Sequence, residues 1–200
     1  IDVLKSVWER AMSFVKKAGT VILLATILVW FLSRFNFQLQ LLGEDDMDNS
    51  ILAVIGNGIA WLFAPLGWGK WKAVVAAVTG LIAKENIVGT FGTLFHYSGA
   101  EELAENGDQI WQQVQEYFGN GIAGYSFLAF NLLCAPCFAA IGAIRREMNN
   151  GKWTLFAIAW ECSLAYCVSL VIYQIGGLIA GVVSFNVFTI VALALIGLGI

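Results

Sequence analysis

The sequence predicts an all-α protein, a polytopic transmembrane bundle of about six helices, and three observations carry this prediction. Apolar residues make up 59% of the chain and charged residues 12%, about half the charged share of a soluble domain. The charges collect in short blocks. Between the blocks lie apolar runs close to the roughly 20 residues that a helix needs to cross a bilayer. The net charge of −3 gives no support to a nucleic-acid partner.

The first element is a charged amphipathic segment, residues 1–17, whose apolar side chains recur at helical spacing. It is either a lead-in helix lying on the cytoplasmic membrane surface or the wet start of the next span. Residues 18–35 form the first span. An acidic loop then leads to a shorter second span, 51–67, which ends near Pro65 and is followed by the basic turn WGKWK.

The third span, residues 71–95, is interrupted by AKEN at 83–86. A polar, acidic, extracytoplasmic loop follows at 96–124. The C-terminal part, 125–200, holds three further spans, which are 125–144, 153–175 and 184–200. The chain begins without Met and stops inside an apolar run, so we expect it to be a fragment of a longer polypeptide.

The basic turns predict the orientation. With six alternating crossings, the Lys and Arg residues of the N-terminus, the WGKWK turn and the 145–152 turn fall on one side, and the acidic loops fall on the other. Short loops rich in Lys and Arg mark the cytoplasmic side. The N-terminus is therefore expected in the cytoplasm, and the count requires that segment 71–95 cross the membrane once.

Three spans place polar or soft side chains near the bilayer midplane, given a rise of about 1.5 Å per residue. These side chains are Lys84, Glu85, Cys134, Cys137, Glu161 and Cys162. A charge at this depth costs about 2.5–3.5 kcal/mol even on insertion scales, so it usually faces a wet cavity or a substrate path. For Lys84 and Glu85 the alternative is a structural ion pair. Glu161 is a second ligand, a partner of Lys84, or a residue of a wet cytoplasmic vestibule.

Residues near Lys84 favour an interrupted helix. Asn86 and several glycines surround the pair, and such a composition suits a helix that unwinds in the membrane and exposes carbonyls to a cation.

The stretch CAPC predicts a second interruption. Pro136 lacks a backbone donor and clashes with the carbonyl of Leu132, four residues earlier, so the helix should kink or open at the cysteines. Redox catalysis needs an exposed, low-pKa thiolate, which this setting does not offer. Cys134 and Cys137 are interpreted as soft ligands along a metal path. Buried small residues are the alternative, and that is the simpler reading of Cys162.

Other chemistry has no motif here. The sequence lacks a P-loop, a serine-hydrolase elbow and H-E-x-x-H, so neither an enzyme nor a nucleotide site is expected in this chain.

Several strings resemble one transporter family in the right order. VTGLIAKENIVGTFGTLF at 78–95 is similar to the AKE element of the ferrous iron transport protein B family, FeoB. CAPCFAAIGAIRREM at 134–148 and WTLFAIAW at 153–160 resemble the later membrane region of that family. SVWERAMSFVKKAGTVILLATILVWFLS at 6–33 resembles the entry to its second Gate segment, which would run to residue 95.

The resemblance implies part of a GTP-dependent Fe(II) uptake transporter in the bacterial cytoplasmic (inner) membrane. Family members carry a GTPase domain and a first Gate segment, which would be partners of this chain, and a homo-oligomer is expected. The pore cysteine of the family falls best on Cys137, and the acid of its AKE element is Glu85. The acid at Glu161 does not belong to the resemblance.

Two other functions stay open. Gate segments are similar to nucleoside-transporter domains, so the chain could move an organic solute. Alternatively, it is a structural anchor that holds the GTPase and promotes its oligomerisation, in which case Glu85→Gln would cost nothing in uptake.

Overall fold

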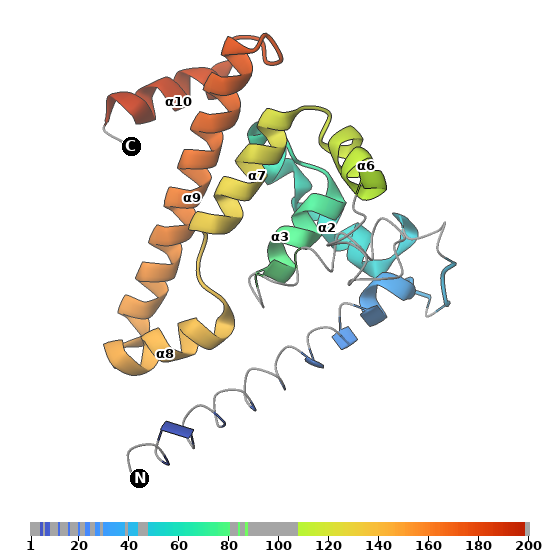
Figure 1. Ribbon diagram of the computed structural model, residues 1–200, viewed down its shortest axis with the longest axis vertical. Helices are drawn as coiled ribbons and strands as arrows, with labels where there is room; N and C mark the ends of the chain where they lie inside the picture. The colour runs from blue at the N-terminus through green and yellow to red at the C-terminus, as the bar shows by residue number, and fades with distance from the viewer. Residues whose placement is uncertain are drawn as a thin grey trace. The chain divides into compact units, whose positions relative to one another are not determined.

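The computed structural model describes residues 51–80 and 108–198 and, outside them, shorter pieces. The pieces are 30–38, 40–43, 48–50, Lys84, Ile87 and scattered positions from Lys5 to Leu28. The elements drawn in Figure 1 are helices, and the described residues contain only an isolated bridge, between Phe35 and Leu41, in place of a strand. The predicted all-α class is confirmed.

The chain forms two compact units, residues 1–52 and 53–200. In the first unit the described positions from Lys5 to Arg34 are helical. A turn follows, in which the Asn36 side-chain oxygen accepts from the backbone N–H groups of Gln38 and Gln40. The predicted lead-in helix 1–17 lies mostly outside the described residues.

The second unit contains the helices that position the candidate site. They are α2 (Ile51–Phe63), the 3-10 helix η2 (Ala64–Leu66), α3 (Trp71–Gly80), α6 (Asp108–Phe118), α7 (Gly121–Leu133), α8 (Phe138–Met148), α9 (Gly151–Ile179) and α10 (Val187–Gly197). In Figure 1, α7 lies along α9, while α8 and α10 lie at opposite ends of α9. Ser126 and Ser169 join α7 to α9, because each hydroxyl donates to the other residue's carbonyl, at 3.0 and 2.9 Å.

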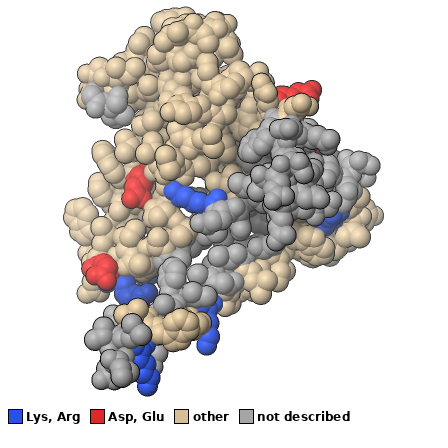
Figure 2. All heavy atoms as spheres, in the orientation of Figure 1, with Lys and Arg blue, Asp and Glu red and all other residues tan. Residues whose placement is uncertain are grey.

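Helix α9 has the length and composition of a membrane span. It has 29 residues, about 43 Å at the α-helical rise, and its apolar window is only 17% buried. Large apolar side chains such as Trp153, Leu155 and Trp160 are exposed, and Figure 2 shows almost no charge around α10 and the adjoining half of α9. Lipid is the solvent that suits such a surface. Among the described residues, α9 alone passes as an unbroken span, so the count of six stays a prediction.

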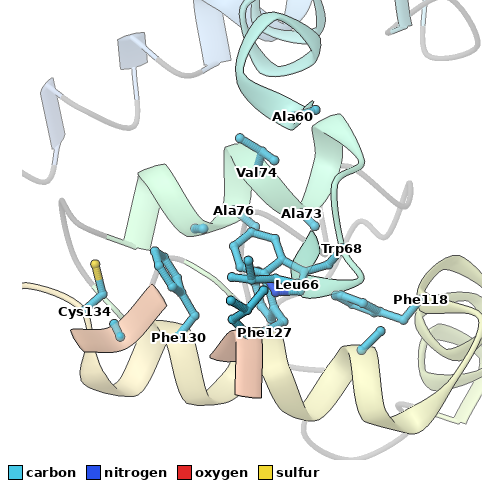
Figure 3. Close-up of a cluster of buried hydrophobic side chains, with 14 of the residues drawn as sticks. Ala60, Leu66, Trp68, Ala73, Val74, Ala76, Phe118, Phe127, Phe130 and Cys134 are labelled. Carbon is cyan, nitrogen blue, oxygen red and sulfur yellow. The ribbon is translucent and has the colours of Figure 1, made fainter. Parts of the chain in front are cut away.

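The core of this unit gathers around the turn between α2 and α3 (Figure 3). Trp68 is 1% exposed and stacks on Phe63, with ring centroids 4.6 Å apart. Phe127 of α7 meets the Trp68 ring edge-on at 5.2 Å. Pro65 in the first turn of η2 and Gly67 at φ +89° end α2 and turn the chain by 93° into α3. Aromatic packing therefore holds this turn against α7.

Helix α9 satisfies the carbonyls that this turn leaves open. The Tyr166 hydroxyl donates to the Leu62 carbonyl, and the Gln174 amide donates to the Pro65 carbonyl, both at 2.7 Å. The Gln174 oxygen accepts from the hydroxyl of Thr189 on α10 at 3.2 Å. Gln174 is 2% exposed, so it links three elements inside the bundle.

Replacing Gln174 with leucine should destabilise the protein by about 1–3 kcal/mol, because a buried carbonyl and a buried hydroxyl lose partners. Thermal unfolding in detergent, followed by tryptophan fluorescence, would measure the change. Ser163→Ala is the matched control, since Ser163 is exposed on the same helix and bonds only to Ala159 of its own turn. Equal stability of Gln174→Leu and the control would contradict the role of this link.

The structure separates the WGKWK turn from the 145–152 turn, and the common cytoplasmic side predicted for the two stays a prediction. Gln174 binds Pro65, close to this turn, and lies 22 residues from Lys152 on one continuous helix, roughly 33 Å at 1.5 Å per residue. That distance matches the roughly 30 Å hydrocarbon core. The turn containing Lys70 therefore lies at the end of α9 opposite the basic turn of Arg145 and Lys152. Pro65 and Gly67 bend the chain by 93° between α2 and α3, which hydropathy and charge did not reveal.

The single crossing predicted for segment 71–95 stays a prediction, because within 81–95 the structure describes only Lys84 and Ile87. Lys70 donates to the Tyr117 carbonyl at the end of α6, and its ammonium lies 4.7 Å from the Tyr117 ring centre. Lys70 precedes α3, whereas Tyr117 lies within the expected outer loop 96–124. Lys70 and Tyr117 therefore lie at the same end of the bundle. The bend between α2 and α3 is that of a broken span or of a re-entrant element.

Candidate functional site

The predicted opening of the helix at the two cysteines is confirmed. Helix α7 ends at Leu133, and Cys134 is extended at ψ 162°. Helix α8 begins at Phe138 after Cys137, which is extended at ψ 158°. Cys134–Cys137, here called the CAPC break, is the non-helical link between them. The cause is Pro136, which removes a backbone donor and pushes the preceding residue out of helical geometry.

Lys84 fills the gap in hydrogen bonding that the proline creates. Its ammonium donates to the Leu132 carbonyl at 3.1 Å and to the Cys134 carbonyl at 3.4 Å. In a regular helix the N–H of residue 136 would donate to the Leu132 carbonyl, but Pro136 has no N–H. The carbonyl end of α7 also carries the negative end of the helix dipole, which favours a cation. Lys84 therefore binds two backbone carbonyls. The structural ion pair that the sequence offered as an alternative for Lys84 is not among the described contacts.

The structure brings Cys134 and Cys162 together. Their sulfur atoms are 3.5 Å apart, and Cys134 is 8% exposed whereas Cys162 is half-buried. Cys162 lies 10 residues from Lys152 and 12 from Gln174 on α9, so roughly 15 and 18 Å along the axis from those two residues. This places the CAPC break near mid-height of α9. The midplane depth of these thiols in a bilayer stays a prediction.

The other predicted residues are not joined to this group. Cys137 and Glu161 are both half-buried, and neither side chain makes a hydrogen bond or ion pair with a residue that the structure describes. The predicted pairing of Glu161 with Lys84 is thus not among the described contacts. Glu85 and Asn86 lie outside the described residues.

The sequence interpretation overlooked Asn131, one turn before the CAPC break. It is 9% exposed, its amide donates to the Phe127 carbonyl at 2.8 Å, and its side-chain oxygen lies 3.5 Å from where a Cβ on Gly80 would stand. It therefore faces α3 at the end nearest Lys84. The sequence did contain a signal for it: a side-chain amide within an apolar span usually either serves function or forms hydrogen bonds that hold helices together.

The donor set at the break is mixed and open. It combines thiols, which prefer soft and borderline metal ions, with carbonyl oxygens, which replace hydration water. Within the described part of the chain, no group of three or more His, Cys, Asp and Glu side chains could enclose a metal. Such an arrangement fits transient contact with a cation better than a closed structural site.

Comparison with known proteins is consistent with this geometry. Residues 15–151 match the family described as Gate, nucleoside recognition. The Fe(2+) transporter FeoB of Methanocaldococcus jannaschii is 41% identical over 183 residues, covering 88% of this chain and 26% of that protein. That of Staphylococcus aureus strain COL is 33% identical over 175 residues, covering 87% and 24%. That of Shigella flexneri is 33% identical over 214 residues, covering 84% and 27%.

The chain thus spans about a quarter of the length of the curated relatives that it matches. No solved structure matches it.

Proposed function

The chain belongs to the Gate family and to the membrane region of the FeoB family, and on that premise we propose that it forms part of the path by which Fe(II) crosses the membrane. The observation that carries the proposal is the CAPC break. Two thiols, Cys134 and Cys162, and the carbonyls held by Lys84 meet there at mid-height of the longest apolar helix.

The proposed path uses weak contacts in series. Fe(II) is a borderline ion that accepts thiolate, carboxylate and carbonyl ligands. Cys137 is the first candidate ligand, because it is more exposed than Cys134 and stands at the start of α8. Glu85 would supply a carboxylate. Glu161, one residue before Cys162, would attract the cation toward the break. Each contact must be weak enough for release.

The wider setting is also part of the proposal. The chain would work in a multi-pass protein of the bacterial cytoplasmic membrane, with its N-terminus in the cytoplasm. A GTPase domain and a first Gate segment would be its partners, GTP would be bound by the GTPase domain, and copies would assemble as a homo-oligomer. The relatives are Fe(2+) transporters by name, which supports the iron substrate, whereas nucleotide coupling rests on the family resemblance.

Replacing Cys137 with serine is expected to lower Fe(II) uptake about tenfold or more, since even outer-shell partners of a metal are worth about 10–100-fold. The measurement is uptake of radioactive Fe(II) into membrane vesicles holding the protein. Cys167→Ser is the matched control, because Cys167 is a similarly half-buried thiol of α9 that lies outside the break. Unchanged uptake and metal selectivity in Cys137→Ser would overturn the ligand role.

A nucleoside-like solute is the second candidate, and the description of the matched family favours it. Isothermal titration of the detergent-solubilised protein with Fe(II), Mn(II), Zn(II) and uridine separates the two. Saturable heat with uridine and none with Fe(II) would favour the second candidate. The thiols at the break support the metal, because soft sulfur ligands add little to the recognition of a sugar or a base.

A further inference from the structure

The close contact between Cys134 and Cys162 has a consequence that does not depend on iron. We propose that these two thiols are a modification site, which a two-electron oxidant of the peroxide class converts into a disulfide between the end of α7 and the middle of α9. The sulfur atoms are 3.5 Å apart, and a disulfide needs about 2.05 Å, so an approach of about 1.5 Å joins them.

The local backbone allows that approach. Cys162 lies within the continuous helix α9, whereas Cys134 is the C-cap of α7: its N–H still donates to the Phe130 carbonyl at 2.8 Å, but its backbone is extended at ψ 162°. Its sulfur can move toward α9 without breaking a helical turn of its own. Cys137 and Cys167 are also free thiols, but neither has a sulfur partner among the described residues.

Exposure sets the order of the chemistry. Cys162 is the less buried thiol, so the peroxide meets it first. Its sulfur attacks one peroxide oxygen, the O–O bond breaks, and a sulfenic acid and one water form. The Cys134 sulfur then attacks the Cys162 sulfur, the S–O bond breaks, and the leaving hydroxide takes the Cys134 proton as a second water. Two thiols lose two electrons and the peroxide gains them.

The disulfide would change the site in two ways. It removes both sulfur atoms as metal ligands, and it ties the CAPC break to α9. A consequence for transport rests on the proposed function, in which these thiols line the Fe(II) path. In that case peroxide would stop uptake, and a dithiol reductant would restore it.

The test measures the thiols directly in the protein within membrane vesicles. After hydrogen peroxide treatment, free thiols are blocked with N-ethylmaleimide, and the digested protein is analysed by mass spectrometry. The expected result is a linked peptide containing Cys134 and Cys162, loss of maleimide at both, and retention of maleimide at Cys137 and Cys167. Dithiothreitol should reverse the change. Cys167→Ser should behave like the unaltered protein, and Cys134→Ser should leave Cys162 unlinked.

Four labelled thiols after peroxide, or a linkage between any other pair, would overturn the proposal. The result is independent of the iron proposal. A linked Cys134–Cys162 pair together with unchanged uptake in Cys137→Ser would leave this inference standing and defeat the Fe(II) path. If peroxide left Cys134 and Cys162 as free thiols while Cys137→Ser lost uptake, the disulfide proposal would fail and the Fe(II) path would stand.

Discussion

Replacing Gly69 with alanine is expected to prevent the turn between α2 and α3 from forming as it does here. A Cβ at this position would stand 2.5 Å from the Ala64 Cα, 2.6 Å from the Ala64 nitrogen and 2.7 Å from the Ala60 carbonyl oxygen. All three are backbone atoms, so a change of rotamer cannot relieve the clash. Overpacking typically costs about 1–3 kcal/mol and occasionally more, and a clash with backbone atoms should fall at the upper end of that range.

The effect should extend beyond the turn because of the two neighbours of Gly69. Trp68, just before it, lies in the core, and Lys70, just after it, donates a hydrogen bond to the Tyr117 carbonyl of α6. Thermal unfolding in detergent and protease sensitivity would both report the loss. The control is Gly124→Ala in α7, where a Cβ meets nothing within 4 Å and alanine favours the helix by about 0.5–1 kcal/mol. If Gly69→Ala proved as stable as Gly124→Ala, the tight passage of the backbone at Gly69 would be incorrect.

Replacing Lys84 with methionine is expected to destabilise the CAPC break by about 1.5–3 kcal/mol, the usual value of a hydrogen bond to a charged group. Methionine keeps most of the length and apolar volume but cannot donate to the carbonyls of Leu132 and Cys134. Without the ammonium, the Leu132 carbonyl has lost both its helical donor, through Pro136, and its replacement.

The measurement combines a thermal unfolding midpoint with the rate at which a maleimide labels Cys134. The midpoint should fall and the labelling should accelerate, because Cys134 is now only 8% exposed. Lys84→Arg is the matched control: it retains a cation with several donors and should keep most of the stability. Equal midpoints and equal labelling rates for the methionine and arginine variants would mean that Lys84 does not hold the break.

Local chemistry explains why one part of the site was predictable. The effect of Pro136 is steric and reaches only four residues back, so the stretch CAPC alone predicts an opened helix with Cys134 and Cys137 at its edges. The predicted midplane depth of these thiols follows equally from run lengths and the constant helical rise.

A pattern of charges does not reveal an apolar segment that bends sharply. Counting Lys and Arg assumes that every apolar run crosses the bilayer. The α2–η2–α3 segment bends by 93°, and its turn lies with the end of α6 near one end of α9. A bent run of this kind has the composition of a straight span, so charge counting assigned Lys70 to the side of Arg145.

The amino-acid sequence was sufficient for the helical class, the family and the interrupted helix at Pro136, because each follows from local sterics, composition or motif. The partners of the candidate site residues required the folded chain. Lys84 meets Leu132 across 48 positions and Cys134 meets Cys162 across 28. Those contacts depend on how α7 packs against its neighbours, and a packing between distant helices is set by the complementarity of whole faces, which no short stretch of sequence contains.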